Sequence, residues 1–394
     1  MYQNYRYFCT VTSQKLPVHL SRPVIRTFLA LLALLLRPAA QAQTQVPERI
    51  WQDRIMRVSP LYGEPDTLSL VVIGDVMMHK RQLDYDCAPF LEQLSGRFRE
   101  ADIAVANMEF TLAGEPYTGY PAFSAPDAYA DYVAGLGVNV FLTANNHILD
   151  KGRNGLRRTL GKYRAMEGVS IAGTAEDEKA DSTAFPLLLT AKGFRIALVN
   201  FTYGTNAAAT DGWPKVHIEN REEIGRAIGR ARRLGADFIV VLPHWGTEYR
   251  LRHSPAQESL ARWLAEQGAD AVVGAHPHVV QDSCRIGRTP VFYSLGNAVS
   301  NMSATNTRLA LMVTLRFTKD RQRQMEMLPP RTDYLWCTLP GTLTDSYATI
   351  FVRDYIGKRD LWKNPSDYDN MMATYRRVKA ETGIDDGTTD ALTD

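Results

Sequence analysis

Cysteine is scarce in this sequence, and the net charge is close to zero. The 394 residues include 4 cysteines, and those beyond residue 42 are Cys87, Cys284 and Cys337. An odd number of thiols at these spacings allows one disulfide at most and matches no thiolate metal motif, so we expect small buried side chains. The formal net charge is +2, with lysine and arginine scattered along the chain. This pattern excludes a bulk nucleic-acid footprint, and nucleic acid is not an expected partner.

The apolar run near the N-terminus is too short to cross a bilayer. Phe28–Leu36 falls well below the roughly 20 residues that a membrane-spanning helix needs. Arg22 and Arg26 precede this run, and Ala40-Gln41-Ala42 follows it. A basic flank, a short apolar core and small residues at this spacing are typical of a secretory signal. We therefore predict a signal peptide over residues 1–42 and an exported protein of the periplasm or cell envelope; a buried helix or a short membrane anchor is the alternative.

Beyond the predicted signal, apolar segments alternate with amphipathic ones. Residues 43–66 are polar and contain three prolines, which predicts a linker. Short apolar runs then alternate with stretches such as Arg221–Leu234, where apolar residues recur at helical spacing. Strand–helix alternation of this kind predicts an α/β fold over residues 67–330. Residues 331–394 are aromatic and then charged, and we expect them to form a small C-terminal extension.

Polar, metal-capable residues follow six of the apolar runs. The runs are Leu68–Ile73, Ile103–Ala106, Val138–Thr143, Phe238–Leu242, Ala271–Val273 and Val291–Tyr293. Next to them stand, in the same order, Gly74-Asp75, Asn107-Met108-Glu109, Asn145-Asn146-His147, Pro243-His244-Trp245-Gly246, Gly274-Ala275-His276-Pro277-His278 and Ser294-Leu295-Gly296-Asn297. Ligand sites in α/β folds gather at the carboxyl ends of strands, where loops converge. We therefore expect these residues to meet at one site.

The residue types in this set are those of a metal centre. His276 and His278 stand two residues apart, and in an extended segment residues i and i+2 point to the same side, so both imidazoles can approach one ion. Asp75 and Glu109 add carboxylate oxygens, and Asn146 adds an amide oxygen. Carboxylate, amide and imidazole together favour Zn, Mn or Fe over a thiolate site. A single histidine at a strand end is usually structural, but the set as a whole predicts a divalent metal ion.

Six motifs in order resemble the CapA family of poly-γ-glutamate capsule synthesis proteins. They lie between about residues 68 and 300 and read Gly74-Asp75, Asn107-Met108-Glu109, Asn145-Asn146-His147-Ile148-Leu149-Asp150, His244-Trp245-Gly246-Thr247-Glu248-Tyr249, Gly274-Ala275-His276-Pro277-His278 and Ser294-Leu295-Gly296-Asn297. The family is similar to the calcineurin-like metallophosphatases. The resemblance implies a metallophosphatase-like β-sandwich flanked by helices, with one or two metal ions at one end.

The resemblance also implies roles for individual residues. The implied metal ligands are Asp75, Asn107, Glu109, Asn146, His244, His276 and His278. The implied catalytic acid or charge-stabilising group is His147, and Asp150 is close enough in sequence to orient its ring; the cap of a helix near Asn154 is the alternative for Asp150. The residues expected to line a substrate pocket are Trp245, Glu248, Tyr249, Ser294 and Asn297, with simple packing as the alternative for Trp245 and Tyr249.

The first two motifs depart from the wider metallophosphatase pattern. That pattern begins Asp-x-His, but Met77 stands at its third position here, and Asn107 and Glu109 are the candidates for its second, aspartate-centred motif. His79, four residues beyond Asp75, is a candidate substitute, although a surface histidine is the simpler expectation. The number of metal ions and the catalytic competence of the site are therefore open at this point.

These features predict an exported metal-dependent hydrolase linked to poly-γ-glutamate capsule synthesis or export. The expected partners are an anionic polymer or envelope substrate and the capsule synthesis machinery, and the bond cleaved is an amide or a phosphoester. One alternative is a non-catalytic polymer-binding export or assembly component, which need not hold a stoichiometric metal ion. The other is a periplasmic phosphoesterase, which phosphate-ester and γ-glutamyl peptide assays would distinguish from the leading hypothesis.

Overall fold

The computed structural model describes residues 52–53, 66–208, 212–320 and 324–388. The predicted signal peptide and almost all of the predicted linker lie outside these residues. Among the residues that are described, no helix combines the length and apolar character needed to cross a membrane.

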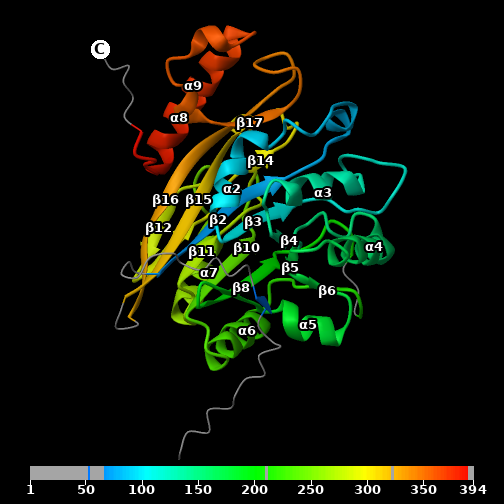
Figure 1. The fold of residues 1–394 in the computed structure, drawn as a ribbon, viewed down its shortest axis with the longest axis vertical. Helices are drawn as coiled ribbons and strands as arrows, with labels where there is room; N and C mark the ends of the chain where they lie inside the picture. Colours follow the sequence, from blue (N-terminus) through cyan, green and yellow to red (C-terminus); the bar gives the residue numbers. More distant parts are fainter. Residues whose placement is uncertain (1–51, 54–65, 209–211, 321–323, 389–394) are drawn as a thin grey trace, which may run out of the picture. The chain divides into compact units, whose positions relative to one another are not determined.

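Two β-sheets form the centre of the described chain (Figure 1). In the described residues, one sheet has seven strands in the order β1 (Gln52–Asp53), β7 (Leu187–Ala191), β8 (Phe194–Thr202), β10 (Phe238–His244), β11 (Ala271–Val273), β13 (Thr289–Phe292) and β12 (Ser283–Ile286). The other has eight, in the order β17 (Ala348–Phe351), β16 (Met325–Thr338), β15 (Leu309–Lys319), β2 (Asp66–Val76), β3 (Ile103–Met108), β4 (Val140–Leu142) and β5 (Ser170–Ala172), with β14 (Asn297–Val299) paired to β2. A small third sheet pairs β6 (Thr174–Ala175) with β9 (Lys215–Val216).

Alternation along β2 explains why the two sheets pack face to face. Leu70 and Val72 belong to a buried cluster that also contains Leu198 of β8, so this cluster lies between the sheets. Val71 and Ile73 point to the opposite face, where a second buried cluster includes residues of several helices. Because successive strand residues point to opposite faces and both faces are covered, the strand is apolar along nearly its whole length.

Helices cover the outer faces of both sheets (Figure 1). The eight-stranded sheet packs against α2 (Ser95–Glu100) and α3 (Asp127–Gly135), and the seven-stranded sheet packs against α6 (Arg221–Arg233) and α7 (Pro255–Glu266). The other helical elements are η2 (Lys80–Asp84), η3 (Glu92–Leu94), α4 (Gly152–Arg164), α5 (Glu178–Ala184), α8 (Val352–Tyr355), η4 (Arg359–Leu361) and α9 (Pro365–Thr382). The predicted α/β sandwich flanked by helices is confirmed.

The C-terminal part of the chain continues the eight-stranded sheet before it forms helices. Strand β16 runs through residue 331, where the sequence predicted the extension to begin, and it pairs with both β15 and β17. Arg308, next to β15, donates hydrogen bonds of 2.6 and 2.7 Å to the Asp367 carboxylate on α9. Its guanidinium carbon also lies 4.3 Å from the ring centre of Trp336. Helix α9 is thereby joined to the sheet through a largely buried ion pair.

Parallel pairing brings the carboxyl ends of several strands together. Strands β2, β3 and β4 are parallel neighbours in one sheet, and β8, β10 and β11 are parallel neighbours in the other. In the register of the first sheet, Asp75 pairs with Asn107. An isolated parallel bridge joins His244, the last residue of β10, to Ala275. The polar residues predicted to follow the strands therefore lie at adjoining strand ends.

Candidate metal centre

Five of the predicted ligands, together with Glu248, form three overlapping groups of carboxylates and imidazoles. The groups are Glu109 with His244 and His276, Asp75 with Glu109 and His278, and Glu248 with His276 and His278. Within each group the candidate ligand atoms lie within 4.8 Å of one another. Glu109, His276 and His278 each belong to two of the groups, so the three groups form one continuous cluster. Their roles as ligands stay predictions, but the structure places these side chains in one cluster.

Glu109 is the most unusual side chain of the cluster. It is fully buried just beyond β3, and neither carboxylate oxygen has a hydrogen-bond partner within the described part of the chain. Burial, followed by the charge of nearby Asp75, raises the pKa of Glu109 well above its ordinary value of 4.5. The nearest basic atoms are the Nε2 atoms of His244 and His278, which lie 3.6 and 3.9 Å from Oε1, too far for a hydrogen bond. Without a hydrogen bond, an ionised carboxylate in this environment needs a proton or a cation nearby.

Asp75 and Asn297 fix the position of His278. The Nδ1 atom of His278 lies 3.3 Å from Asp75 Oδ2 and 2.8 Å from Asn297 Oδ1. Burial by itself lowers the pKa of His278, but the hydrogen bond and charge of Asp75 outweigh it and raise that pKa. Asn297 is fully buried and orients this imidazole, and its predicted part in substrate binding stays a prediction.

Asn107 and Asn146 hold His244 from its two sides. His244 Nδ1 lies 3.2 Å from Asn107 Nδ2, and that same amide nitrogen donates a 2.7 Å hydrogen bond to Asp75 Oδ1. On the other side, His244 Nε2 lies 2.8 Å from Asn146 Oδ1 and 3.6 Å from Glu109 Oε1. Asn146 thus presents an oxygen toward the cluster, as a ligand must. Asn107 presents its amide nitrogen, which is a hydrogen-bond donor, and this orientation suits the positioning of Asp75 and His244.

The backbone around His276 and His278 is not extended, and the geometric premise drawn from the sequence was wrong on this point. Strand β11 ends at Val273, and the two histidines have φ angles of 102° and 58°. The chain turns sharply at each of them, yet the ring centres come within 5.9 Å. Gly274 permits this path, because a Cβ atom there would lie 2.2 Å from the carbonyl oxygen of Tyr293. Left-handed backbone at bulky residues is uncommon and is concentrated at functional sites.

His147 lies beside the cluster and is oriented by Asp150. Its Nδ1 atom is 2.7 Å from Asp150 Oδ2, and the same oxygen accepts a hydrogen bond from the Phe123 backbone N–H. An imidazole that donates from Nδ1 to a carboxylate has Nε2 available for a substrate. The alternative for Asp150, a helix cap, is wrong, because the residue at the N-cap of α4 is Lys151. Asn206, which the sequence pattern did not reveal, lies 3.2 Å from His147 Nδ1 through its Nδ2 atom.

His79 is not the surface histidine that was the simpler expectation. Its ring packs edge-on against Phe123 at 5.2 Å, and its Nε2 atom is buried without a partner among the described residues. Burial, with smaller contributions from His278 and His147, lowers the pKa of His79 to about 4. A neutral imidazole with an unpaired nitrogen near the cluster is a further candidate ligand.

The residues predicted to bind substrate divide into buried and exposed sets. Trp245 and Ser294 are buried, and Trp245 Nε1 donates to the carbonyl oxygen of Tyr293. This burial favours the packing alternative for Trp245, and contact of either residue with a substrate stays a prediction. Tyr249 is exposed, and Glu248, predicted for the pocket, also belongs to one of the three ligand groups. Sequence reasoning missed this ligand capacity because an acidic residue in a polar loop carries no distinctive pattern.

Three exposed tyrosines surround the cluster, and each contacts one of its histidines. Tyr203 lies 4.5 Å from the His276 ring, Tyr249 lies 6.3 Å from the His278 ring, and Tyr120 lies 6.4 Å from the His147 ring. Tyr120 and Tyr203 were not predicted as site residues. Solvent-exposed aromatic side chains next to buried polar groups are typical of a ligand entrance.

The donor atoms of the cluster fit a divalent cation. In the described chain, both Glu109 oxygens, His79 Nε2 and His276 Nδ1 are buried without hydrogen-bond partners. Burial and then His278 lower the pKa of His276 to about 3, and burial is also the main reason that the pKa of His244 is low. Neutral imidazoles and carboxylates are the forms that bind Zn, Mn or Fe. A cation here would compensate the buried carboxylates, and its identity and number stay predictions.

Comparison with known proteins agrees with the motif order. A family model described as "Bacterial capsule synthesis protein PGA_cap" matches residues 69–302. The capsule biosynthesis protein CapA of Bacillus anthracis is 28% identical over 71% of this chain and 71% of its own length. The PGA biosynthesis protein CapA of Bacillus subtilis is 29% identical over 67% of this chain and 71% of its own length. The resemblance to CapA is confirmed.

Solved structures provide a more distant likeness. The NAD nucleotidase NadN of Haemophilus influenzae matches 80% of this chain and 68% of its own chain, with a TM-score of 0.45 and 12% identity. A 5'-nucleotidase from Candida albicans matches 81% of this chain and 58% of its own, with a TM-score of 0.42 and 11% identity. Likeness at this level carries no argument about activity.

Proposed function

Because the chain belongs to the PGA_cap family of bacterial capsule synthesis proteins, we propose that it is an exported metal-dependent hydrolase acting on poly-γ-glutamate or a related anionic envelope polymer. The names of its relatives, capsule biosynthesis protein CapA and PGA biosynthesis protein CapA, support a capsule-associated role. The single observation that supports the metal-dependent activity is the environment of the Glu109 carboxylate. A fully buried carboxylate without a hydrogen bond to either oxygen, shared by two ligand groups, is explained by a bound cation.

In this proposal one set of residues binds the cation and a second set donates protons. Asp75, Glu109, His244, His276 and His278 would hold one or two divalent ions, with Asn146 as an oxygen donor and Glu248 and His79 as further candidates. A bound divalent ion supplies Lewis-acid activation of water and of the substrate's carbonyl or phosphoryl oxygen.

His147 is the proton donor in this proposal. Asp150 accepts a hydrogen bond from Nδ1 and keeps the ring in one orientation, while Nε2 lies 3.5 Å from Asn206 Nδ2. In this proposal Nε2 carries the proton that is donated. A proton delivered from Nε2 to the leaving nitrogen of a γ-glutamyl amide would assist cleavage, and positioned general acids of this kind contribute about 10²–10⁴-fold in rate. Tyr120 and Phe123 pack on the His147 ring and limit its movement.

Metal analysis and a pair of substrates test this function. Protein purified without chelator is expected to contain stoichiometric Zn, Mn or Fe, and to shorten poly-γ-glutamate in a reaction that chelator stops and metal restores. Absence of a stoichiometric ion would support the non-catalytic polymer-binding component instead. Metal-dependent cleavage of a phosphate ester without cleavage of γ-glutamyl oligomers would support the phosphoesterase. Export is tested separately by N-terminal sequencing of the mature protein.

A further inference from the structure

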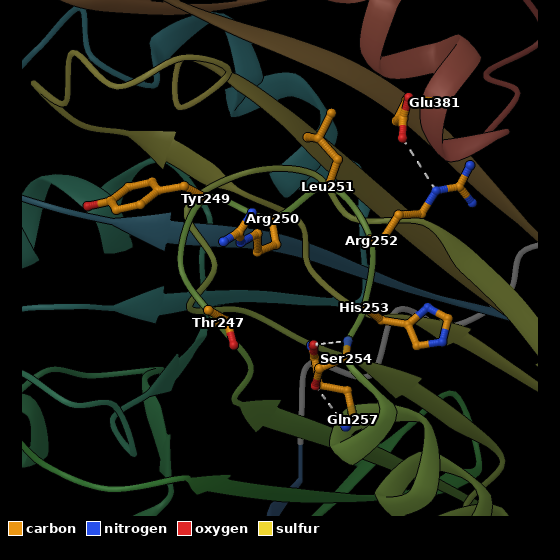
Figure 2. A pocket seen from close by; sticks show the side chains of 9 residues that line it. All are labelled: Thr247, Tyr249, Arg250, Leu251, Arg252, His253, Ser254, Gln257 and Glu381. Atoms are coloured by element: carbon orange, nitrogen blue, oxygen red, sulfur yellow. Dashed lines mark hydrogen bonds and ion pairs between the residues drawn. The ribbon is translucent and has the colours of Figure 1, made fainter.

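An open cavity adjoins the metal centre at Tyr249 and is lined mainly by the segment that leaves the centre. Its volume is about 770 Å³. Figure 2 shows the lining side chains, which are Thr247, Tyr249, Arg250, Leu251, Arg252, His253, Ser254, Gln257 and, from α9, Glu381. Volumes of about 300–1,000 Å³ are typical of ligand sites. The same segment contributes Glu248 to the ligand group with His276 and His278. One segment of the chain therefore contributes both to the cavity and to the centre. None of the residues that line the cavity belongs to the three ligand groups.

Buried hydrogen bonds hold this segment in one conformation. The side-chain amide of Gln281 is completely buried and donates to the carbonyl oxygens of Arg250 and Arg252, at 2.9 and 3.2 Å. Gln257, also buried, donates a 2.8 Å hydrogen bond to the Gln281 side-chain oxygen. The Asp282 backbone N–H donates to the Leu251 carbonyl oxygen. A wall fixed in this way is preorganised, which reduces the entropy that a ligand must overcome on binding.

Tyr249 stands at the junction between the cavity and the metal centre. It lines the cavity, and its ring centre lies 6.3 Å from that of His278. Its backbone has a φ of 64°, and its N–H donates to the Pro277 carbonyl oxygen. Its side chain is 45% exposed, so burial of the ring does not explain this strained conformation. The conformation instead places an aromatic wall where a ligand reaching from the centre into the cavity would pass.

Two arginines line the cavity, and they differ in whether their side chains are already paired. Arg252 is already paired, because its guanidinium lies 3.6 Å from Glu381 and 3.5 Å from Asp282, and the Glu381 contact is drawn in Figure 2. The Arg250 guanidinium, by contrast, has no hydrogen bond or ion pair within the described part of the chain. An unpaired guanidinium presents a fork of donors that matches a carboxylate.

We propose that this cavity is a subsite for the non-reacting part of an acidic chain, with Tyr249 at the junction and Arg250 binding a carboxylate. The proposal rests on the proposed function, because it places the reacting bond at the metal centre. A ligand that reaches both the metal centre and the cavity that Tyr249 lines must be longer than one monomer of a polymer. A flexible oligomer with repeated carboxylates has that length and charge.

Binding to metal-free protein tests the subsite without relying on catalysis. The probe is a fluorescent decamer of γ-linked glutamate, measured by anisotropy against chelator-treated full chain, with a neutral γ-linked glutamine decamer as competitor. Arg250→Gln is expected to weaken binding of the acidic decamer roughly tenfold or more, the effect of losing one charged hydrogen-bond pair. Arg288→Gln is the matched control, because Arg288 is also exposed but lies on the β12–β13 turn outside the cavity. It is expected to bind within about twofold of the wild type.

The outcomes separate the subsite from the hydrolase. Unchanged binding by Arg250→Gln would overturn the subsite, as would an equal loss in Arg288→Gln, which would indicate general charge attraction, or equal competition by the neutral decamer. If the decamer is not cleaved but binding depends on Arg250, the subsite stands and the hydrolase proposal fails. If metal-dependent cleavage occurs with KM unaffected by Arg250→Gln, the hydrolase stands and the subsite fails. A raised KM with kcat retained supports both.

Discussion

Replacing Glu109 with glutamine is expected to make the metal-free protein more stable while it abolishes metal binding. Glu109 is fully buried, and burial together with Asp75 raises its pKa well above 4.5. An acid with a raised pKa keeps its proton in the folded state at pH values where the unfolded chain has released it. The free energy of unfolding of the metal-free wild type therefore falls as pH rises above about 4.5. Glutamine does not titrate, so the variant loses this decline.

The magnitude follows from linkage. Each unit by which folding raises the Glu109 pKa removes about 1.4 kcal/mol from the stability of the metal-free protein once pH exceeds that raised value. Metal at a hundred times its dissociation constant stabilises the wild type by about 2.7 kcal/mol, which raises the melting temperature by roughly 5 °C. Glu109→Gln removes a ligand shared by two groups, so its metal-induced increase should nearly vanish.

Calorimetric melts from pH 4 to 8, with chelator and with each of Zn, Mn and Fe, measure both effects, and elemental analysis measures metal content. Glu222→Gln is the control, because that side chain is 79% exposed on α6 and its replacement should change stability by less than about 0.5 kcal/mol. A wild-type metal content in Glu109→Gln would refute its role as a ligand. A metal-free variant markedly less stable than the wild type would refute the argument from an uncompensated buried charge.

Three further predictions concern the proposed proton donor His147, the C-terminal helix α9 and export. His147→Ala should retain metal while turnover falls about 10²–10⁴-fold; loss of metal in a folded variant would make it a ligand, and unchanged turnover would make it structural. Arg308→Met should destabilise the fold by about 3–5 kcal/mol in urea titrations, because it leaves Asp367 buried and unpaired, whereas Arg359→Gln, in the exposed pair with Asp369, should leave the urea midpoint close to that of the wild type. Mature protein should begin just after Ala42, and an intact N-terminus on cytoplasmic protein would contradict that expectation.

The helix and strand assignments were largely predictable because apolar periodicity is a local property. The residues Ile224, Ala227, Ile228 and Ala231 recur at helical spacing, and all are buried in α6. The apolar runs with short polar ends became parallel strands, since a strand covered on both faces must be apolar throughout. Periodicity does not report pairing, however, and nothing in residues 331–338 distinguished a continuation of β16 from a separate extension.

The types of ligand atom could likewise be predicted from the residue types, whereas the orientation of each side chain could not. Asp75, Glu109 and the three strand-end histidines have oxygen and nitrogen donors wherever they fold. The i, i+2 argument for His276 and His278 assumed an extended chain, but both have left-handed backbone that only their packing imposes. Trp245 is buried and Glu248 joins a ligand group, although both stand in the same motif.

The sequence by itself determined the order of the motifs, the family that they indicate, and the presence of oxygen and nitrogen donors without thiolates at the candidate site. These depend only on residue identity and local spacing. The tertiary structure alone decided which atoms meet. The His276 backbone N–H lies 3.3 Å from Asp75 Oδ2 across 201 positions of sequence, and Arg252 of the cavity meets Glu381 of the last helix. Contacts of this kind arise when two sheets and their helices pack together. The burial of Glu109 and the unpaired charge of Arg250 within the described chain follow from that packing and not from the local sequence.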